Sequence, residues 1–131
     1  MKTFILAISL ALVSTSVGAQ GSNPCGQYMT TYDIEQCLEK TLKARDNELN
    51  SAYQQLIKSF RPLGSYDKTN YPAVRKHLID AQLAWIKFRD NDCRAKYTLW
   101  EEGTIRGIKS LSCRIDHTEL RTQQLKAWRR P

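Results

Sequence analysis

Four cysteines carry the most versatile chemistry in this sequence: Cys25, Cys37, Cys93 and Cys113. Thiolates bind zinc, but structural zinc sites are built on close pairs such as Cys-x-x-Cys, and the sequence contains no such pair. The two histidines, His77 and His117, lie far apart, so we expect them at the surface or hydrogen-bonded. In a small exported domain, an even number of cysteines is typical of disulfides. If the chain is exported, we therefore expect two disulfides and no metal or cofactor.

The beginning of the chain has the pattern of an export signal. A short positive start precedes an apolar run, Phe4 to Val13, that is too short to span a bilayer, and small and polar residues follow up to Ala19. This pattern predicts a signal peptide over residues 1–19 and one domain over residues 20–131; an uncleaved N-terminal anchor is the alternative. Cleavage after Ala19 delivers the domain to the periplasm or the medium, with no transmembrane span.

Three helices must position the residues that carry chemistry. Apolar residues at steps of three, four and seven predict a helix over residues 31–60. A second helix, opened by Pro72, runs to about residue 97, and a third covers about 108–128. The expected inner face of the second helix carries Leu78, Ala81, Trp85, Phe88 and Cys93. The aromatic residues assigned to the core are Tyr53, Phe60, Trp85 and Phe88. Short links favour antiparallel neighbours, so the expected fold is all-α, a disulfide-stapled up-down-up three-helix domain.

This topology brings the four cysteines to one end of the domain. Cys25 precedes the first helix and Cys37 lies near its start, whereas Cys93 ends the second helix and Cys113 begins the third. Either pattern of bridges between neighbours is geometrically open. We favour Cys25–Cys37 and Cys93–Cys113 because each closes a local loop, and closing a loop of this size contributes about 3 kcal/mol in the chain-entropy model.

Polar side chains also fall on or beside the seams between the helices: Asp46, Asn50, Gln82, Arg89, Asp90 and Arg121. Asp46 and Asp90 could serve as an acid–base pair, but such a pair needs a cleft and pKa values pushed apart. Three packed helices offer no evident cleft, and no nucleophile–base set is visible. We therefore expect no catalytic residues and no enzyme, but a polar network that fixes the helix register. Asp46 and Arg121 lie at matching heights, so we expect them to pair.

Three sequence blocks resemble a known family. They read Asp46-x-x-Leu49-Asn50-x-x-Tyr53, Leu78-x-x-Ala81-Gln82-x-x-Trp85-Ile86-x-Phe88-Arg89-Asp90-x-x-Cys93 and Cys113-x-x-x-x-Thr118-x-x-Arg121-x-x-x-Leu125. Together they resemble the LprI-like lysozyme inhibitor domain, a family of small exported bacterial helical proteins, over about residues 25–128. The resemblance implies a cell-envelope location and inhibition of lysozyme. The sequence departs from the family in one loop, where Glu102-Gly103-Thr104 replaces two adjacent glycines.

The expected function is therefore that of a protein that blocks lysozyme or a related cell-wall hydrolase. Such an inhibitor must fill a groove that carries two carboxylates, and a rigid frame can present a loop to it at little entropic cost. The candidate segment is 98–107, in which two glycines permit unusual backbone angles. The candidate contact residues are Glu101, Glu102, Gly103, Thr104, Ile105 and Arg106. We expect Arg106 to pair with a carboxylate of the groove. In the competing interpretation the loop only turns the chain.

The charge of the chain complicates this interpretation. The full sequence has a net charge of +7, from 20 Lys+Arg and 13 Asp+Glu. Animal lysozymes are generally strongly basic, so repulsion opposes binding unless a local acidic patch such as Glu101-Glu102 offsets it. The alternative function is a basic envelope-stress or structural protein of the periplasm with no lysozyme target. Lys126, Arg129 and Arg130 would then allow peripheral contact with anionic lipid. Nucleic acid is not an expected partner, because no aromatic platform is interleaved with the basic residues.

Overall fold

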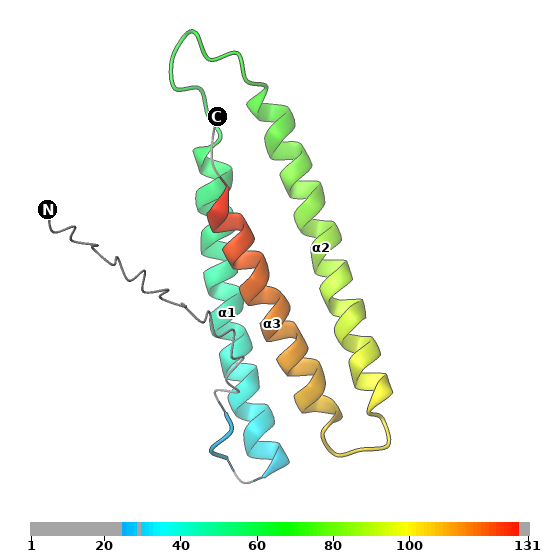
Figure 1. Ribbon diagram of the computed structural model, residues 1–131. Helices are drawn as coiled ribbons and strands as arrows, with labels where there is room; N and C mark the ends of the chain where they lie inside the picture. The colour runs from blue at the N-terminus through cyan, green and yellow to red at the C-terminus, as the bar shows by residue number, and fades with distance from the viewer. Residues whose placement is uncertain (1–24, 29, 129–131) are drawn as a thin grey trace, which may run out of the picture.

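The computed structural model describes residues 25–28 and 30–128, and in these residues it consists of three α-helices and no strands (Figure 1). Helix α1 spans Thr31–Ser59, α2 spans Tyr71–Leu99 and α3 spans Arg106–Ala127. Consecutive helices run in opposite directions, so the expected all-α, up-down-up fold is confirmed. The predicted signal peptide lies outside the described residues, as do Arg129 and Arg130. In the part of the chain that is described, no helix combines the length and the hydrophobicity needed to cross a bilayer.

Side-chain caps explain where the first two helices begin. The Thr30 hydroxyl accepts a hydrogen bond from the backbone N–H of Asp33 at 3.1 Å, and Asn70 Oδ1 accepts one from the N–H of Ala73, also at 3.1 Å. Each cap satisfies one of the N–H groups that the first turn of a helix leaves without a partner. Helix α3 begins at Arg106, and its N-cap residue, Ile105, provides no side-chain cap. Its start, expected at residue 108, is therefore the one that the sequence signals least clearly.

Helix α3 joins the other two helices into one bundle. It packs along both α1 and α2, whereas α1 and α2 make little contact with each other. In Figure 1 the gap between α1 and α2 is narrower near the link that connects them and widens toward the α2–α3 loop. The bundle is therefore organised around α3.

The apolar core is divided into two clusters along the bundle. One cluster is centred on Leu49, Ala52, Phe60, Tyr71, Leu78 and Leu125. The other, next to the first disulfide, is centred on Cys25, Leu38 and Ile115. Buried polar residues, Gln82, Thr118 and Thr122, lie along the same inward faces of α2 and α3. These three polar residues are thus part of the bundle interior.

The inner face of α2 differs in part from the predicted one. Leu78 and Cys93 are buried, and Trp85 packs against the first core cluster, as expected. Ala81 is exposed and Phe88 is 55% exposed, so assigning them to the interior was wrong. The inward positions are instead taken by Gln82 and Arg89, because polar partners on α1 and α3 satisfy them. The Phe88 ring lies edge-on to the His117 ring, with the ring centres 5.3 Å apart, at the margin of the α2–α3 interface.

Candidate functional site

Two disulfides fasten one end of the bundle. Cys25 is bonded to Cys37 and Cys93 to Cys113, with Cα–Cα distances of 5.8 and 5.6 Å, and no cysteine is free. This is the pairing favoured above on the ground that it closes local loops. The first bridge holds the N-terminal segment on α1, and the second ties the end of α2 to the start of α3. The second bridge therefore restrains the α2–α3 loop at its base.

A layer of polar side chains crosses the middle of the bundle around Arg89. Its side chain is only 12% exposed, and its guanidinium donates to Asp46 Oδ1 of α1 at 2.8 Å and to Thr118 Oγ1 of α3 at 2.9 Å. It also donates to Asp90 Oδ1 at 3.2 Å. A single side chain of α2 thus bonds to both other helices. Asp46 and Asp90 share one guanidinium, an arrangement that suits a structural role better than an acid–base pair.

The predicted pair of Asp46 with Arg121 was wrong. Asp46 bonds to Arg89, and Arg121 Nε donates to Gln82 Oε1 at 3.0 Å. The prediction compared heights on the first and third helices only, whereas the long Arg89 side chain reaches the Asp46 level from the second. Burial lowers the pKa of Arg121. Asn50 is exposed on α1. Of the other residues predicted for the polar network, Asp46 and Asp90 bond to Arg89, and Gln82 bonds to Arg121.

A second polar group surrounds the disulfide between α2 and α3. His117 Nε2 and Asp92 Oδ2 are 2.8 Å apart, and potential ligand atoms of Asp92, Cys93, Cys113 and His117 all lie within 4.8 Å of one another. Because the two sulfurs are bonded to each other, only one carboxylate and one imidazole remain to act as ligands. His117 is therefore hydrogen-bonded, and His77 is exposed on α2. Only the Cys-x-x-x-His spacing in α3 signals this group in the sequence.

The α2–α3 loop, residues 100–105, is braced by two cations from the start of α3. Arg106 donates to the carbonyl oxygen of Glu101 at 2.9 Å, and its guanidinium lies 5.4 Å from the centre of the Tyr97 ring. The Lys109 ammonium lies 5.0 Å from the centre of the Trp100 ring. In the free protein, Arg106 is thus engaged within the loop, whereas the Glu101 and Glu102 side chains are exposed.

The two glycines of the candidate segment have different surroundings. Neither has a positive φ, so the expectation of unusual backbone angles was wrong. A Cβ added at Gly103 would lie 3.5 Å from the Trp100 carbonyl oxygen, which is an ordinary contact. A Cβ added at Gly107 would lie 2.1 Å from Glu35 Oε1, so the Glu35 side chain would have to move. Gly107 therefore allows the Glu35 carboxylate to lie against the start of α3.

A hollow of about 550 Å³ opens where this loop meets the start of α1. Its lining includes the carboxylates of Glu35, Glu101 and Glu102, and one guanidinium, that of Arg106. The lining is completed by Thr31, Tyr32, Tyr97, Gly103, Thr104 and Gly107. We call Glu35, Glu101 and Glu102 the acidic rim. Glu101 and Glu102 were predicted from the sequence and Glu35 was not, although antiparallel helices necessarily bring the start of α1 to the α2–α3 loop.

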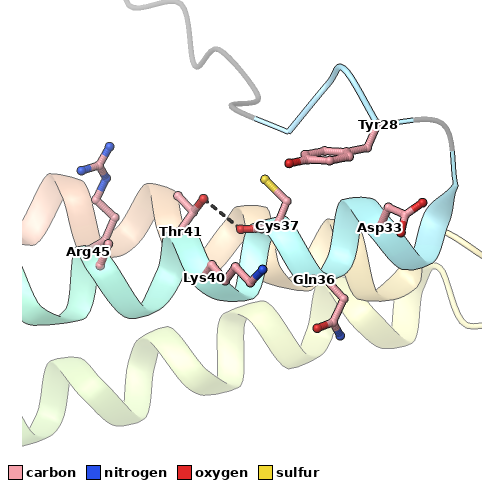
Figure 2. Close-up of a pocket in the computed structure, with 8 residues that line it drawn as sticks. Tyr28, Asp33, Gln36, Cys37, Lys40, Thr41 and Arg45 are labelled. Atoms are coloured by element: carbon pink, nitrogen blue, oxygen red, sulfur yellow. Dashed lines mark hydrogen bonds between the residues drawn. The ribbon is translucent and has the colours of Figure 1, made fainter.

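Another hollow, of about 500 Å³, lies between α1 and the N-terminal segment (Figure 2). Figure 2 shows the Tyr28 ring over the part of α1 that carries Cys37, and the Thr41 hydroxyl donating to the Cys37 carbonyl oxygen, at 3.0 Å. Its charged lining residues are Asp33, Lys40 and Arg45. Arg45 is held by Glu119 and Glu48, each at 2.7 Å, and these bonds raise its pKa. With both signs of charge present, this hollow favours neither a cationic nor an anionic ligand.

Comparisons with known proteins agree with the resemblance found in the sequence. The family model described as "Lysozyme inhibitor LprI" matches residues 22–125. A protein of Rhizobium meliloti (strain 1021), described as "Uncharacterized protein R02472", is 29% identical over 132 residues, which is 96% of this chain and 94% of that protein. No solved structure gives a significant match. Since the family model covers most of the chain, including both disulfides and the polar layer, this protein belongs to the lysozyme inhibitor LprI family.

Proposed function

We propose that this protein is an exported inhibitor of a lysozyme-type cell-wall hydrolase and that it binds through the acidic rim. The observation that carries the proposal is the hollow at the stapled end of the bundle, which is lined by three carboxylates and only one guanidinium. Membership in the LprI family supports a hydrolase as the partner. The protein then acts by occupying the enzyme's groove and needs no catalytic residues of its own.

The acidic rim provides local negative charge that offsets the net positive charge of the whole chain at the site of contact. The net charge of +7 opposes the approach of a basic enzyme at long range. At physiological ionic strength, however, exposed charges more than about 8 Å apart are largely screened, so the groups near the contact dominate the interaction. At the loop end, Glu101 and Glu102 are exposed to such a partner, and Glu35 lines the same hollow. We therefore infer that the target presents lysine or arginine side chains beside its substrate groove.

The frame around the loop supports an inhibitory role. A loop that is already ordered loses little conformational entropy on binding. The Cys93–Cys113 bridge, the Arg106 bond to Glu101 and the two cation–ring contacts all restrict this loop before any partner is present. Arg106 accordingly braces the loop in this proposal, and the carboxylates make the intermolecular ion pairs.

The proposal predicts that removing one charge of the acidic rim weakens inhibition. Glu102→Gln should raise the inhibition constant against a basic lysozyme about tenfold, since a close interfacial charge pair is worth roughly 1.5 kcal/mol or more. The matched control is Asp116→Asn, which removes the same charge from an exposed position on α3. Inhibition is measured as the loss of lytic activity on bacterial cell walls, at low and at physiological salt.

Two results would count against the proposal. If both variants inhibit as well as the wild type, the interface lies elsewhere on the protein. If the wild type neither binds nor inhibits any member of a panel of basic, neutral and acidic wall hydrolases, the alternative function, a basic envelope protein with no lysozyme target, takes its place.

A further inference from the structure

Helix α2 carries an apolar stripe that the bundle leaves uncovered. Ile79, Leu83 and Ile86 are 42%, 57% and 37% exposed, and their spacing of four and three places them side by side on the helix. Helix α2 packs against α3 and makes little contact with α1. The large apolar residues exposed on α2 are Ile79, Leu83, Ile86, Phe88, Tyr97 and Leu99, whereas α1 has only Tyr32 and α3 only Leu120 in this class among the residues described.

Four charged residues flank this stripe in a definite order. Lys76 and Asp80 lie on its N-terminal side, and Lys87 and Asp90 on its C-terminal side. At 100° per residue, these positions and the three apolar ones cover about a third of the helix circumference. Counted from Leu83, Lys76 lies seven positions before and Asp90 seven after, while Asp80 lies three before and Lys87 four after. If a second copy of this helix runs in the opposite direction, each positively charged position therefore lies opposite a negatively charged one.

We propose that a second copy of this chain docks on the stripe, with the two α2 helices antiparallel and a two-fold axis beside Leu83. Leu83 then meets its own symmetry mate, and Ile79 of each copy packs against Ile86 of the other. Lys76 of each copy faces Asp90 of the other, and Asp80 faces Lys87. A parallel arrangement would instead place each charge opposite an identical one.

The charged groups are available for these contacts. Lys76 and Asp80 form an ion pair of 2.6 Å within α2, but their side chains are 73% and 55% exposed, so this pair stabilises the monomer little and can be exchanged. Lys87 is exposed. Asp90 is 41% exposed and retains room for a third cation beside Arg89 and Arg114. All four charged side chains can therefore form these ion pairs without leaving the protein interior.

The same charges argue against two other occupants. An anionic membrane would gain no net electrostatic attraction here, because Asp80 and Asp90 offset Lys76 and Lys87 beside the apolar residues. An unrelated helix would need charged residues at positions complementary to these four. A second copy of α2 already has them at those positions. The face is about 21 Å long at 1.5 Å per residue, which is small for a protein interface, so we expect a weak dimer with a dissociation constant in the micromolar range.

Sedimentation equilibrium of the oxidised mature protein tests the proposal. The wild type should show a monomer–dimer equilibrium, and Leu83→Asp should weaken it at least tenfold. The control Leu120→Asp changes an equally exposed leucine, 54% against 57%, on α3 and should leave the dimer intact. Circular dichroism establishes that both variants remain folded. A wild type that stays monomeric up to millimolar concentration overturns the proposal, as does binding to phosphatidylglycerol vesicles that Leu83→Asp abolishes in a monomeric protein.

A charge exchange tests the antiparallel register separately. Asp80→Lys and Lys87→Asp should each weaken self-association, because each places like charges opposite one another at two symmetry-related contacts. An equimolar mixture of these two variants should form a heterodimer about as tight as the wild-type dimer, and the variant carrying both changes should again self-associate. If neither the mixture nor the double variant regains association, the two chains do not meet in this register.

Discussion

Arg89 shows how much one side chain contributes to this bundle. Its guanidinium bonds to Asp46 on α1 and to Thr118 on α3, and Thr118 is fully buried. Removing the guanidinium leaves these polar atoms without a partner, and a buried polar group that loses its partner is costly. The aliphatic part of Arg89 also packs in the interior, so the charge is best removed by a substitution that keeps this part.

We therefore predict that Arg89→Met lowers the free energy of unfolding by about 2–3 kcal/mol, less than for a fully buried pair because Asp46 is partly exposed. Asp46→Ala should cost about 1 kcal/mol. Urea unfolding of both single variants and the double variant should show a coupling of about 1 kcal/mol.

A second cycle provides the control for this prediction. Asp46→Ala combined with Arg121→Met should be additive, because Arg121 bonds to Gln82 instead. Coupling in this second cycle and none in the first would mean that the pairing in the polar layer is not the one described.

Particular residues show why the site was only partly predictable. Types and spacing identified Gln82, Arg89 and Asp90 as members of a polar layer, because polar residues at inward positions of a helix stand out against the apolar period. Which acidic side chain bonds to which basic one depends on how far each side chain reaches and on where the third helix packs. The spacing of residues in the sequence does not determine either. Phe88 was assigned to the interior because it follows Leu78, Ala81 and Trp85 at helical spacing, although its position on α2 lies beside the inward face rather than on it.

At the scale of elements, one carboxylate accepts the hydrogen bonds that hold the α1–α2 link together. Asp67 accepts hydrogen bonds from the Tyr71 hydroxyl at 2.7 Å, from the Thr69 N–H at 3.1 Å and from the Leu63 N–H at 3.3 Å. The Tyr71 hydroxyl bond, followed by the backbone bond from Thr69, lowers the Asp67 pKa from 3.8 to about 2. These bonds join the link to the first turn of α2.

This pKa gives a prediction about acid. Because the folded-state pKa is depressed, the stabilisation by Asp67 is present above pH 3.8 and is lost as the pH falls toward 2. An NMR titration of the Asp67 carboxyl should give a pKa of about 2 in the wild type and a value closer to 3.8 in Tyr71→Phe. An unchanged pKa in that variant would show that the hydroxyl bond is not its main cause.

The helices themselves were the most predictable feature. The expected ranges agree closely with α1, α2 and α3 because the apolar pattern of each helix is long, although Gln82 and Arg89 take inward positions in α2. The start of α3 was placed two residues late, since Ile105 supplies no capping side chain and leaves no signal in the sequence. The acidic rim was found only on the loop, because Glu35 belongs to it through the antiparallel arrangement of α1 rather than through any motif.

At the scale of the whole molecule, export and oxidation can be tested together. We propose that residues 1–19 are removed on export and that the domain begins at residue 20. The intact mass of protein recovered from the periplasm or medium should correspond to residues 20–131 less four hydrogen atoms, and thiol titration after denaturation should detect no free thiol. Retention of residues 1–19 would support the uncleaved anchor, and two or more free thiols would contradict the disulfides.

The central place of α3 has a consequence for how the chain matures. Helices α1 and α2 make little contact with each other, and both rest on the helix that is synthesised last. Until α3 emerges from the ribosome, the core cluster around Leu38 lacks Ile115, and the cluster that contains Leu49 and Leu78 lacks Leu125. Cys93 likewise cannot reach Cys113 before that point. In the proposed export, this order of elements postpones closure of the bundle to the end of synthesis, so that the growing polypeptide can still be threaded through a narrow translocation pore.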